Sequence, residues 1–258
     1  MISSFFMGLR PSSPPLLPLF QRGARLTLSL VKRGGSLYDA SGREKQWRLV
    51  LGMNAAGGIE AMIFDFGNVL IGWDPENLYR KLIPDAAERK HFLTEICHGP
   101  WNALQDAGRS WEEAIAERIA LHPDRADHIH AYRNRFAEML TGPVAEGIEI
   151  LDKVHAAGIP CYGLTNWSSE TYHASRDAMP FLARMQYTAV SGDLKMAKPE
   201  PEIFQHLLGV IGKPAENCAF IDDSPANIAT AKTLGIQAVL FKNDGSATAE
   251  LRALGLPL

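Results

Sequence analysis

The ten residues AMIFDFGNVL, at positions 61–70, place a single carboxylate, Asp65, between two short apolar runs. A short apolar run bounded by polar residues and glycine is typical of a strand buried on both faces of a sheet. Gly67 follows two positions after Asp65, where the chain would turn away from the strand. The pattern therefore predicts a buried strand at residues 60–64 that carries Asp65 at its carboxyl end.

From residue 144 onward, helix-like and strand-like segments alternate with short connections. The predicted helices are EGIEILDKVHAAG (146–158), TYHASRDAM (171–179), PEIFQHLLGVIG (201–212) and SPANIATAKTLG (224–235). The predicted strands are IPCYGLT (159–165), YTAVSG (187–192), CAFI (218–221) and QAVLF (237–241). Such alternation is typical of a parallel sheet flanked by helices. The predicted fold class is α/β, with a Rossmann-like, three-layer parallel sheet as its core.

Residues 74–143 differ from this core because they carry almost no strand signal. SWEEAIAERIALH (110–122) begins with a capping box, Ser110 followed by Glu113, and RADHIHAYRNRFAEML (125–140) is predicted as another helix. An all-helical insertion after the first strand predicts a cap over the sheet. The expected domains are a core at 60–73 and 144–258, a helical cap at 74–143, and an N-terminal extension at 1–59.

The extension at residues 1–59 has eight Lys or Arg and two acidic residues, and it is rich in Ser, Pro and Gly. We expect it to be poorly ordered. Its composition fits an organellar transit peptide and fits equally well an upstream extension from a misplaced start codon. The predicted location is cytoplasmic, with organellar import left open.

Composition also bears on partners. No apolar run approaches the ~18 to 20 residues of a membrane span, so we expect no membrane insertion. Residues 60–258 carry 18 basic and 27 acidic residues, a balance that disfavours nucleic-acid binding. The cysteines Cys97, Cys161 and Cys218 lack paired spacing, which predicts buried free thiols in a reducing compartment.

Polar residues follow the predicted strands at their carboxyl ends, where an open parallel sheet binds ligands. They are Asp65, Thr165, Asn166, Asp222 and Asp223, and Lys198 stands just before a predicted helix. Three neighbouring carboxylates would repel one another without a cation among them, and carboxylate oxygens suit Mg²⁺. Neutral donors, a lysine and a metal around one carboxylate describe a phosphoryl-transfer site with an aspartate nucleophile.

Four segments carry a resemblance to a known family: MIFDFGNVL (62–70), YGLTN (162–166), KPEPEIF (198–204) and FIDDSPANI (220–228). In this order they resemble the four motifs of the haloacid dehalogenase superfamily. The resemblance covers roughly residues 60–258. It is closest to the subgroup with a helical cap between the first two motifs, and within it to the sugar-phosphate and epoxide-hydrolase-associated phosphatases.

The resemblance implies a role for each matching residue. Asp65 would form an aspartyl-phosphate that water hydrolyses, and Asn227 falls where some relatives place a further acid. The implied catalytic residues are Asp65, Thr165 and Lys198; the implied substrate-binding residues are Phe66, Gly67, Thr165, Asn166 and Lys198; and the implied Mg²⁺ ligands are Asp65, Gly67, Asp222 and Asp223. The implied partner is a small-molecule phosphate ester such as a sugar phosphate, and the chain is expected to be a monomer or homodimer.

Gly67 departs from the family pattern, which usually has a second aspartate there. The backbone carbonyl of Gly67 can still bind a metal, but the side chain that protonates the leaving group is missing. General acid or base assistance is typically worth ~10² to 10⁴ in rate, so a slower enzyme is expected. Asp74 and His98 are candidate replacement donors. Trp73 and Trp101 are candidates to line a substrate pocket, although packing in the core or the cap is the simpler explanation for both.

Two alternatives follow from the same residues. The family's dehalogenases need no metal and typically lack the acid pair, so Asp222 and Asp223 favour a phosphatase. A protein that has lost turnover could act as a phosphometabolite-binding or regulatory module. The retained Asp65 and Lys198 argue against that second alternative.

Overall fold

The computed structural model describes residues 31–33, 36–38 and 58–258. Strands β1 (Val31–Arg33) and β2 (Ser36–Tyr38) form an antiparallel pair that the sequence did not predict. This pair belongs to residues 1–53, a unit separate from residues 54–258. The expectation that residues 1–59 are poorly ordered otherwise lies outside the described residues.

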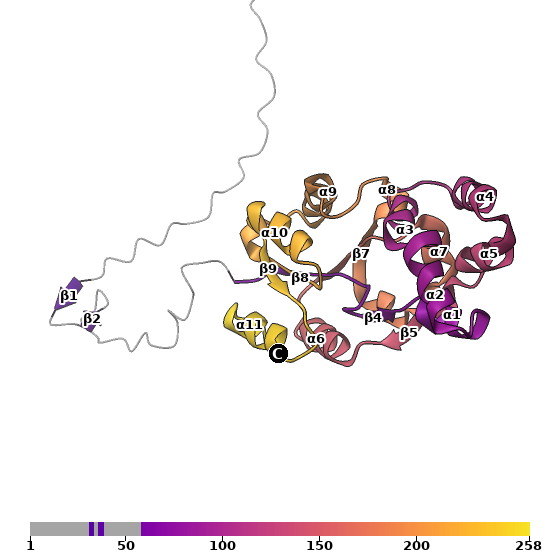
Figure 1. The fold of residues 1–258 in the computed structure, drawn as a ribbon. Helices are drawn as coiled ribbons and strands as arrows, with labels where there is room; N and C mark the ends of the chain where they lie inside the picture. The colour runs from indigo at the N-terminus through magenta and orange to yellow at the C-terminus, as the bar shows by residue number, and fades with distance from the viewer. Residues whose placement is uncertain (1–30, 34–35, 39–57) are drawn as a thin grey trace, which may run out of the picture. The chain divides into compact units, whose positions relative to one another are not determined.

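The centre of the larger unit is a five-stranded parallel sheet with the strand order β7-β6-β3-β8-β9 (Figure 1). Its strands are β3 (Ala61–Phe64), β6 (Cys161–Thr165), β7 (Met185–Val190), β8 (Cys218–Asp222) and β9 (Gln237–Leu240). The five predicted strands are confirmed, with ends that differ by at most two residues. The first strand, β3, lies in the middle of the sheet. The chain adds β6 and β7 on one side of β3 and then β8 and β9 on the other side, so the strand order reverses at β3.

Helices cover both faces of this sheet and make three layers, as predicted. Alternate residues of β3 point to opposite faces, because side chains in a strand alternate. Met62 and Phe64 pack with α6 (Ala145–Ala156) and α11 (Ser246–Ala253), whereas Ala61 and Ile63 pack with α9 (Pro201–Ile211) and α10 (Pro225–Thr233). Figure 1 shows these two helix pairs on opposite sides of β8 and β9. The core therefore buries β3 completely.

A helical cap lies between two short strands, β4 (Ile71–Trp73) and β5 (Leu140–Pro143). Its helices are α1 (Glu76–Leu82), α2 (Ala86–His91), α3 (Gly99–Asp106), α4 (Trp111–Leu121) and α5 (Ala126–Asn134). A π-helical turn occupies Phe92–Ile96, and 3-10 turns occupy Pro123–Arg125 and Phe136–Met139. Figure 1 shows the cap helices grouped on one side of the sheet. The bounds 74–143 for the cap remain a prediction, and these helices lie within them.

The strands β4 and β5 were missed from the sequence. They pair antiparallel, with Ile71 opposite Pro143 and Gly72 opposite Gly142. Strands of three or four residues that contain glycine and proline carry no periodic signal. Only the closure of the cap brings Ile71–Trp73 and Leu140–Pro143, far apart in the sequence, side by side.

Local predictions in the helices were mostly confirmed. The Ser110 side chain accepts a hydrogen bond from the Glu113 backbone N–H at 3.2 Å, which caps α4. The predicted helix at 125–140 is broken at Arg135 into α5 and a 3-10 turn, and the one at 171–179 becomes α7 (Ser169–Ala174) followed by a 3-10 turn at Arg176–Ala178. Further short elements are α8 (Ser191–Leu194) and 3-10 turns at Pro180–Arg184 and Ala215–Asn217.

Two composition-based predictions can be compared with the described part of the chain. Cys97, Cys161 and Cys218 are all buried and free, as expected. Within that part, no helix combines the length and the apolar character needed to cross a bilayer.

Candidate active site

The parallel registers bring the predicted site residues to one edge of the sheet. Phe64, the last residue of β3, pairs with Gly163 of β6 on one side and with Ile221 of β8 on the other. Asp65 therefore leaves the sheet between the ends of its two neighbouring strands, which carry Thr165 and Asp222. This is the crevice that the polar strand ends predicted.

Lys198 is the electrostatic centre of the site. Its ammonium nitrogen lies 2.8 Å from Asp65 Oδ1 and 2.6 Å from Asp222 Oδ2, and the lysine is only 5% exposed. Burial opposes the charge on Lys198, but Asp65 and Asp222 outweigh it and raise the pKa of Lys198. The loop before α9 therefore holds a buried cation between two buried anions.

Asp65 is held in one orientation. Its Oδ1 accepts a hydrogen bond from the Phe66 backbone N–H at 2.7 Å in addition to the contact with Lys198. Burial raises the pKa of Asp65 to about 7, Lys198 opposes this rise, and the charges of Asp222 and Asp223 add to it. The ionised form of Asp65 therefore depends on positive charge nearby.

Asp65, Asp222 and Asp223 each offer one carboxylate oxygen within 4.8 Å of the others, the only such group of acids, cysteines or histidines among the described residues. Burial and the charge of Asp222 raise the pKa of Asp223. Three neighbouring carboxylate oxygens that repel one another fit a hard divalent cation such as Mg²⁺.

The two acids at the end of β8, Asp222 and Asp223, differ in the hydrogen bonds that their carboxylates accept. Both oxygens of Asp222 accept hydrogen bonds from the Asn227 amide at 3.0 Å, and Oδ1 also accepts one from the Ser224 backbone N–H at 2.7 Å. Asp223 is exposed, and its carboxylate faces the Asn68 amide at 3.5 Å. Asp223 is thus the carboxylate with fewer hydrogen bonds, and Asn227 contacts the site through Asp222.

The predicted phosphate-binding residues present mostly backbone groups. The Asn166 side chain makes two hydrogen bonds to the Lys198 backbone, at 2.7 and 2.8 Å, and so fixes the lysine loop. The Phe66 ring is fully buried and packs edge to face on Phe181, with centroids 5.0 Å apart, so only its backbone faces the site. Thr165 is 1% exposed at the end of β6.

Gly67 has room for a side chain. A Cβ placed on it would meet no other atom within 4 Å, and its φ is not in the left-handed region that favours glycine. The backbone therefore does not require glycine here. What glycine contributes is open space, because Gly67 lines a cavity between the core and the cap.

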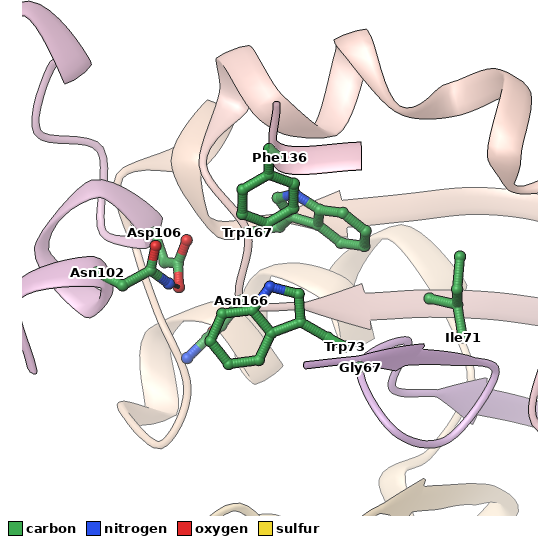
Figure 2. Close-up of a pocket in the computed structure, with 8 residues that line it drawn as sticks. All are labelled: Gly67, Ile71, Trp73, Asn102, Asp106, Phe136, Asn166 and Trp167. Carbon is green, nitrogen blue, oxygen red and sulfur yellow. Dashed lines mark hydrogen bonds between the residues drawn. The ribbon is translucent and has the colours of Figure 1, made fainter. Parts of the chain in front are cut away.

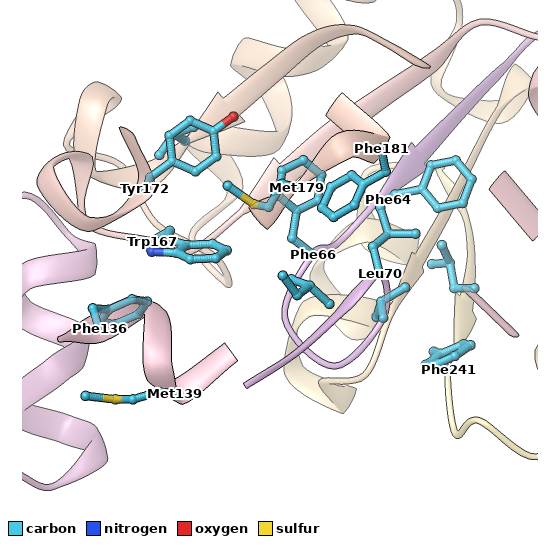
Figure 3. Close-up of a cluster of buried hydrophobic side chains, with 14 of the residues drawn as sticks. Phe64, Phe66, Leu70, Phe136, Met139, Trp167, Tyr172, Met179, Phe181 and Phe241 are labelled. Atoms are coloured by element: carbon cyan, nitrogen blue, oxygen red, sulfur yellow. The ribbon is translucent and has the colours of Figure 1, made fainter. Parts of the chain in front are cut away.

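We call this cavity the aromatic slot. Its volume is about 140 Å³, and its apolar wall comprises Ile71, Trp73, Phe136 and Trp167. A cavity of about 150 Å³ with apolar walls is large enough to hold benzene. Figure 3 shows that Phe136 and Trp167 continue into the buried cluster that contains Phe66 and Phe181. The slot wall is therefore anchored in the same packing that positions the loop after Asp65.

The two polar side chains that α3 contributes to the slot lie at its cap end. Asn102 and Asp106 of α3 lie together on one side of Trp73, and Gly67 lies on the other side (Figure 2). Asp106 Oδ1 accepts a hydrogen bond from the Ser168 backbone N–H at 3.0 Å, and its Oδ2 accepts one from the Asn102 amide at 2.8 Å. Burial raises the pKa of Asp106 to about 7, and the hydrogen bond from the Ser168 backbone N–H opposes this rise only in part.

Sequence reasoning missed Asp106, Asn102 and Asn68. Asp106 and Asn102 stand four positions apart on α3, on a helix face that only the cap's orientation turns toward the sheet. Asn68 has a φ of 56°, and its side chain also accepts a hydrogen bond from the Trp73 backbone N–H at 3.1 Å. An asparagine after Gly67 is a turn signal, which was the one available clue for Asn68.

The candidate proton donors have other roles. Asp74 Oδ1 accepts a hydrogen bond from the Glu76 backbone N–H at 2.9 Å, at the start of α1. His98 Nδ1 accepts one from the Trp101 backbone N–H at 3.1 Å and caps α3. Neither lines the aromatic slot. Trp101 also lies elsewhere, because it packs edge to face against Trp111 inside the cap. Of the two candidate pocket tryptophans, only Trp73 lines the slot.

The structure is that of an α/β protein with a Rossmann-like parallel sheet, a helical cap and a cluster of acidic residues at the carboxyl ends of the strands. The chain belongs to the haloacid dehalogenase-like hydrolases, since the model of that family matches residues 59–235. This finding confirms the family and the hydrolase class that the four motifs suggested.

Two curated relatives are named as a phosphatase and as a flavin mononucleotide hydrolase. Sesquiterpene phosphatase astK of Aspergillus oryzae is 25% identical over 206 residues, which cover 76% of this chain and 96% of that protein. Flavin mononucleotide hydrolase 1 of Arabidopsis thaliana is 29% identical over 108 residues, which cover 42% of this chain and 44% of that protein. The chain spans less than half the length of the Arabidopsis relative and of two further curated relatives, 34% and 19%.

A solved structure supports the fold. The HAD family enzyme bt-2542 of Bacteroides thetaiotaomicron, in a magnesium complex, matches with a TM-score of 0.59 and 22% identity. The match covers 76% of this chain and 99% of that chain.

Proposed function

We propose that the protein is a Mg²⁺-dependent phosphomonoester hydrolase that acts through an aspartyl-phosphate on Asp65. The observation that carries this proposal is the position of Lys198, within 2.8 Å of Asp65 and within 2.6 Å of Asp222, beside the three-acid group. A buried cation next to a carboxylate nucleophile favours approach of a phosphate dianion. The phosphatase and hydrolase names of two relatives, and the magnesium complex of a structural neighbour, support the same assignment.

In the proposed reaction, Asp65 is the nucleophile and other residues of the chain bind the phosphoryl group. An oxygen of Asp65 attacks the phosphorus, and the bond to the leaving oxygen breaks with its electron pair. Water then attacks the aspartyl-phosphate, which restores the carboxylate and releases inorganic phosphate. Lys198, the Thr165 hydroxyl and backbone N–H groups after Asp65 and Thr165, other than the Phe66 N–H that bonds Asp65, would hold the phosphoryl oxygens.

The residues that would hold Mg²⁺ are Asp65, Asp223 and the carbonyl of Gly67. Asp222 would support them through its charge and through its contacts with Lys198 and Asn227. Bound Mg²⁺ would offset the carboxylate charge and polarise a phosphoryl oxygen.

A phosphate-release assay tests the proposal. The protein is incubated with Mg²⁺ and a panel of phosphomonoesters that includes 4-nitrophenyl phosphate, and the panel is repeated with Asp65→Asn. Asp177→Asn, a change at an exposed aspartate, is the matched control. We expect release with the wild type and the control and none with Asp65→Asn. Equal release by Asp65→Asn would remove Asp65 from the mechanism.

Two other outcomes would favour the alternatives. Release of halide from 2-haloacids without metal would point to a dehalogenase. Tight binding of phosphate esters without any turnover would point to a binding or regulatory module.

A further inference from the structure

The aromatic slot contains unpaired polar atoms that face no partner among the described residues. Asn102 is 7% exposed and uses its amide nitrogen on Asp106, but its Oδ1 has no hydrogen-bond partner. The Trp73 indole nitrogen is buried and likewise unpaired. Buried polar groups without partners cost free energy, so the unpaired Asn102 oxygen in a lined cavity points to a ligand that donates a hydrogen bond to it.

The position of these atoms gives the slot a direction. Gly67, directly after the predicted nucleophile loop, lines one end, and Asn102 and Asp106 lie beyond Trp73 at the cap end (Figure 2). A phosphate held beside Asp65 would therefore point its ester group along Trp73 toward α3. The slot is the place for the leaving group rather than for the phosphate.

The lining also specifies chemistry. Trp73, Trp167 and Phe136 present aromatic and apolar surface, which binds rings well and offers little to the hydroxyl groups of a sugar. At the cap end, Asn102 Oδ1 and the Asp106 carboxylate are both hydrogen-bond acceptors. Acceptors that are already close together select a donor on the ligand.

From this geometry we propose that the slot binds a ring-sized, largely apolar leaving group that carries a hydrogen-bond donor, such as a hydroxyl, at its far end. The substrate is then a phosphate ester of an aromatic or similarly flat apolar alcohol rather than a sugar phosphate. This inference rests on the proposed function. It assigns Trp73 to the ring and Asp106, with Asn102, to the donor.

Three substrates separate these contributions: benzyl phosphate, 3-hydroxybenzyl phosphate and sn-glycerol 3-phosphate. Assays at about pH 8 keep Asp106 mainly ionised, since its pKa is about 7. We expect kcat/KM for benzyl phosphate to exceed that for glycerol 3-phosphate at least about tenfold, and the added hydroxyl to raise it further. Equal or better use of glycerol 3-phosphate would overturn the proposal.

Variants test the assignment of each residue. Trp73→Ala should abolish the preference for the ring, and Asp106→Asn should abolish the preference for the hydroxyl. Trp73→Phe should keep the ring preference and shows whether the loss comes from the wall or from misfolding. Leu104→Ser, at a half-exposed position on the same α3, is the matched control and should keep both preferences. A preference that survives in Trp73→Ala or in Asp106→Asn would overturn that assignment and the proposal.

A binding assay separates this inference from the proposed function. Quenching of tryptophan fluorescence measures the affinity for benzylphosphonate and for methylphosphonate, which are not hydrolysed. We expect benzylphosphonate to bind at least about tenfold more tightly, and Trp73→Ala to remove that difference. This result would support the slot even if no phosphate ester were turned over, whereas equal affinities would refute the slot even in an active phosphatase.

Discussion

The substitution Gly67→Asp should turn the protein into a faster phosphatase. A Cβ at Gly67 would meet no atom within 4 Å, and the backbone there is not in the left-handed region, so aspartate fits without strain. The new carboxyl group would follow Asp65 by two positions, where it can protonate the leaving oxygen and then accept a proton from the attacking water. General acid and base assistance is typically worth ~10² to 10⁴ in rate.

The lower end of that range is the better expectation for this chain. Open space around Gly67 means that no neighbouring group would hold the new carboxyl group in one rotamer. We therefore expect kcat on sn-glycerol 3-phosphate, whose alkoxide is a poor leaving group, to rise about 10²-fold. This corresponds to an activation barrier that is lower by about 2.7 kcal/mol. On 4-nitrophenyl phosphate, which needs little protonation to leave, kcat should change about threefold or less.

The assay is the rate of phosphate release at saturating substrate and Mg²⁺ for both esters. Gly67→Asn is the matched control, because it has the same shape but cannot transfer a proton at neutral pH. The reasoning would be refuted if Gly67→Asp and Gly67→Asn changed kcat equally. An equal gain on both esters would also refute it, since proton transfer matters most for the poor leaving group.

Three further predictions follow. Chelation should abolish activity and Mg²⁺ should restore it, and Asp223→Asn should raise the Mg²⁺ concentration for half-maximal rate at least about tenfold; a rate indifferent to chelator would exclude the metal role. Asp106 has a pKa raised to about 7 in the folded chain, so the wild type should lose stability as pH rises from about 4 through about 7. Asp106→Asn should lack the part of this loss that Asp106 causes, so its stability relative to the wild type should rise by up to about 3 kcal/mol between about pH 5 and pH 8 in urea denaturation; parallel pH profiles would contradict this. In α6, a Cβ on Gly147 would collide with the backbone carbonyl of Val69, so Gly147→Ala should lower the free energy of unfolding by about 1 to 3 kcal/mol, whereas Gly209→Ala, with open space in α9, should not; equal urea midpoints would count against it.

The sheet and its acidic edge could be predicted because their signals are local. Each buried strand is a short apolar run, and Asp65, Thr165 and Asp222 each stand at the carboxyl end of such a run. Parallel pairing then forces these residues to one edge, whatever the details of packing. The parallel direction of the strands follows from the same alternation, since each helix returns the chain to the same end of the sheet. Their order does not, because the chain passes from β7 at one side of the sheet to β8 on the other side of β3.

The contents of the slot could not be predicted in this way. Asp106 and Asn102 belong to a cap helix, and their approach to Trp73 depends on how the cap sits on the sheet. That placement is set by long-range contacts, such as the hydrogen bond of 2.7 Å from the Trp111 indole to the Ser168 hydroxyl. No periodicity within α3 reveals such a contact. Asp74 and His98 were chosen by sequence position alone; Asp74 bonds the first backbone N–H of α1 and His98 caps α3.

The glycine at position 67 and the aromatic slot have a common physical consequence. An aspartate at this position would place a polar group at the core end of the slot, where Ile71 and Trp73 otherwise present apolar surface. Glycine keeps that end open to the ring of a leaving group but offers no proton to the leaving oxygen. An aromatic or conjugated alcohol with an acidic hydroxyl needs that proton least, because its oxygen carries negative charge more readily. Among the aromatic esters that fit the slot, the missing acid therefore favours aryl phosphates over benzyl phosphates, because a benzyl alcohol is hardly more acidic than an aliphatic one.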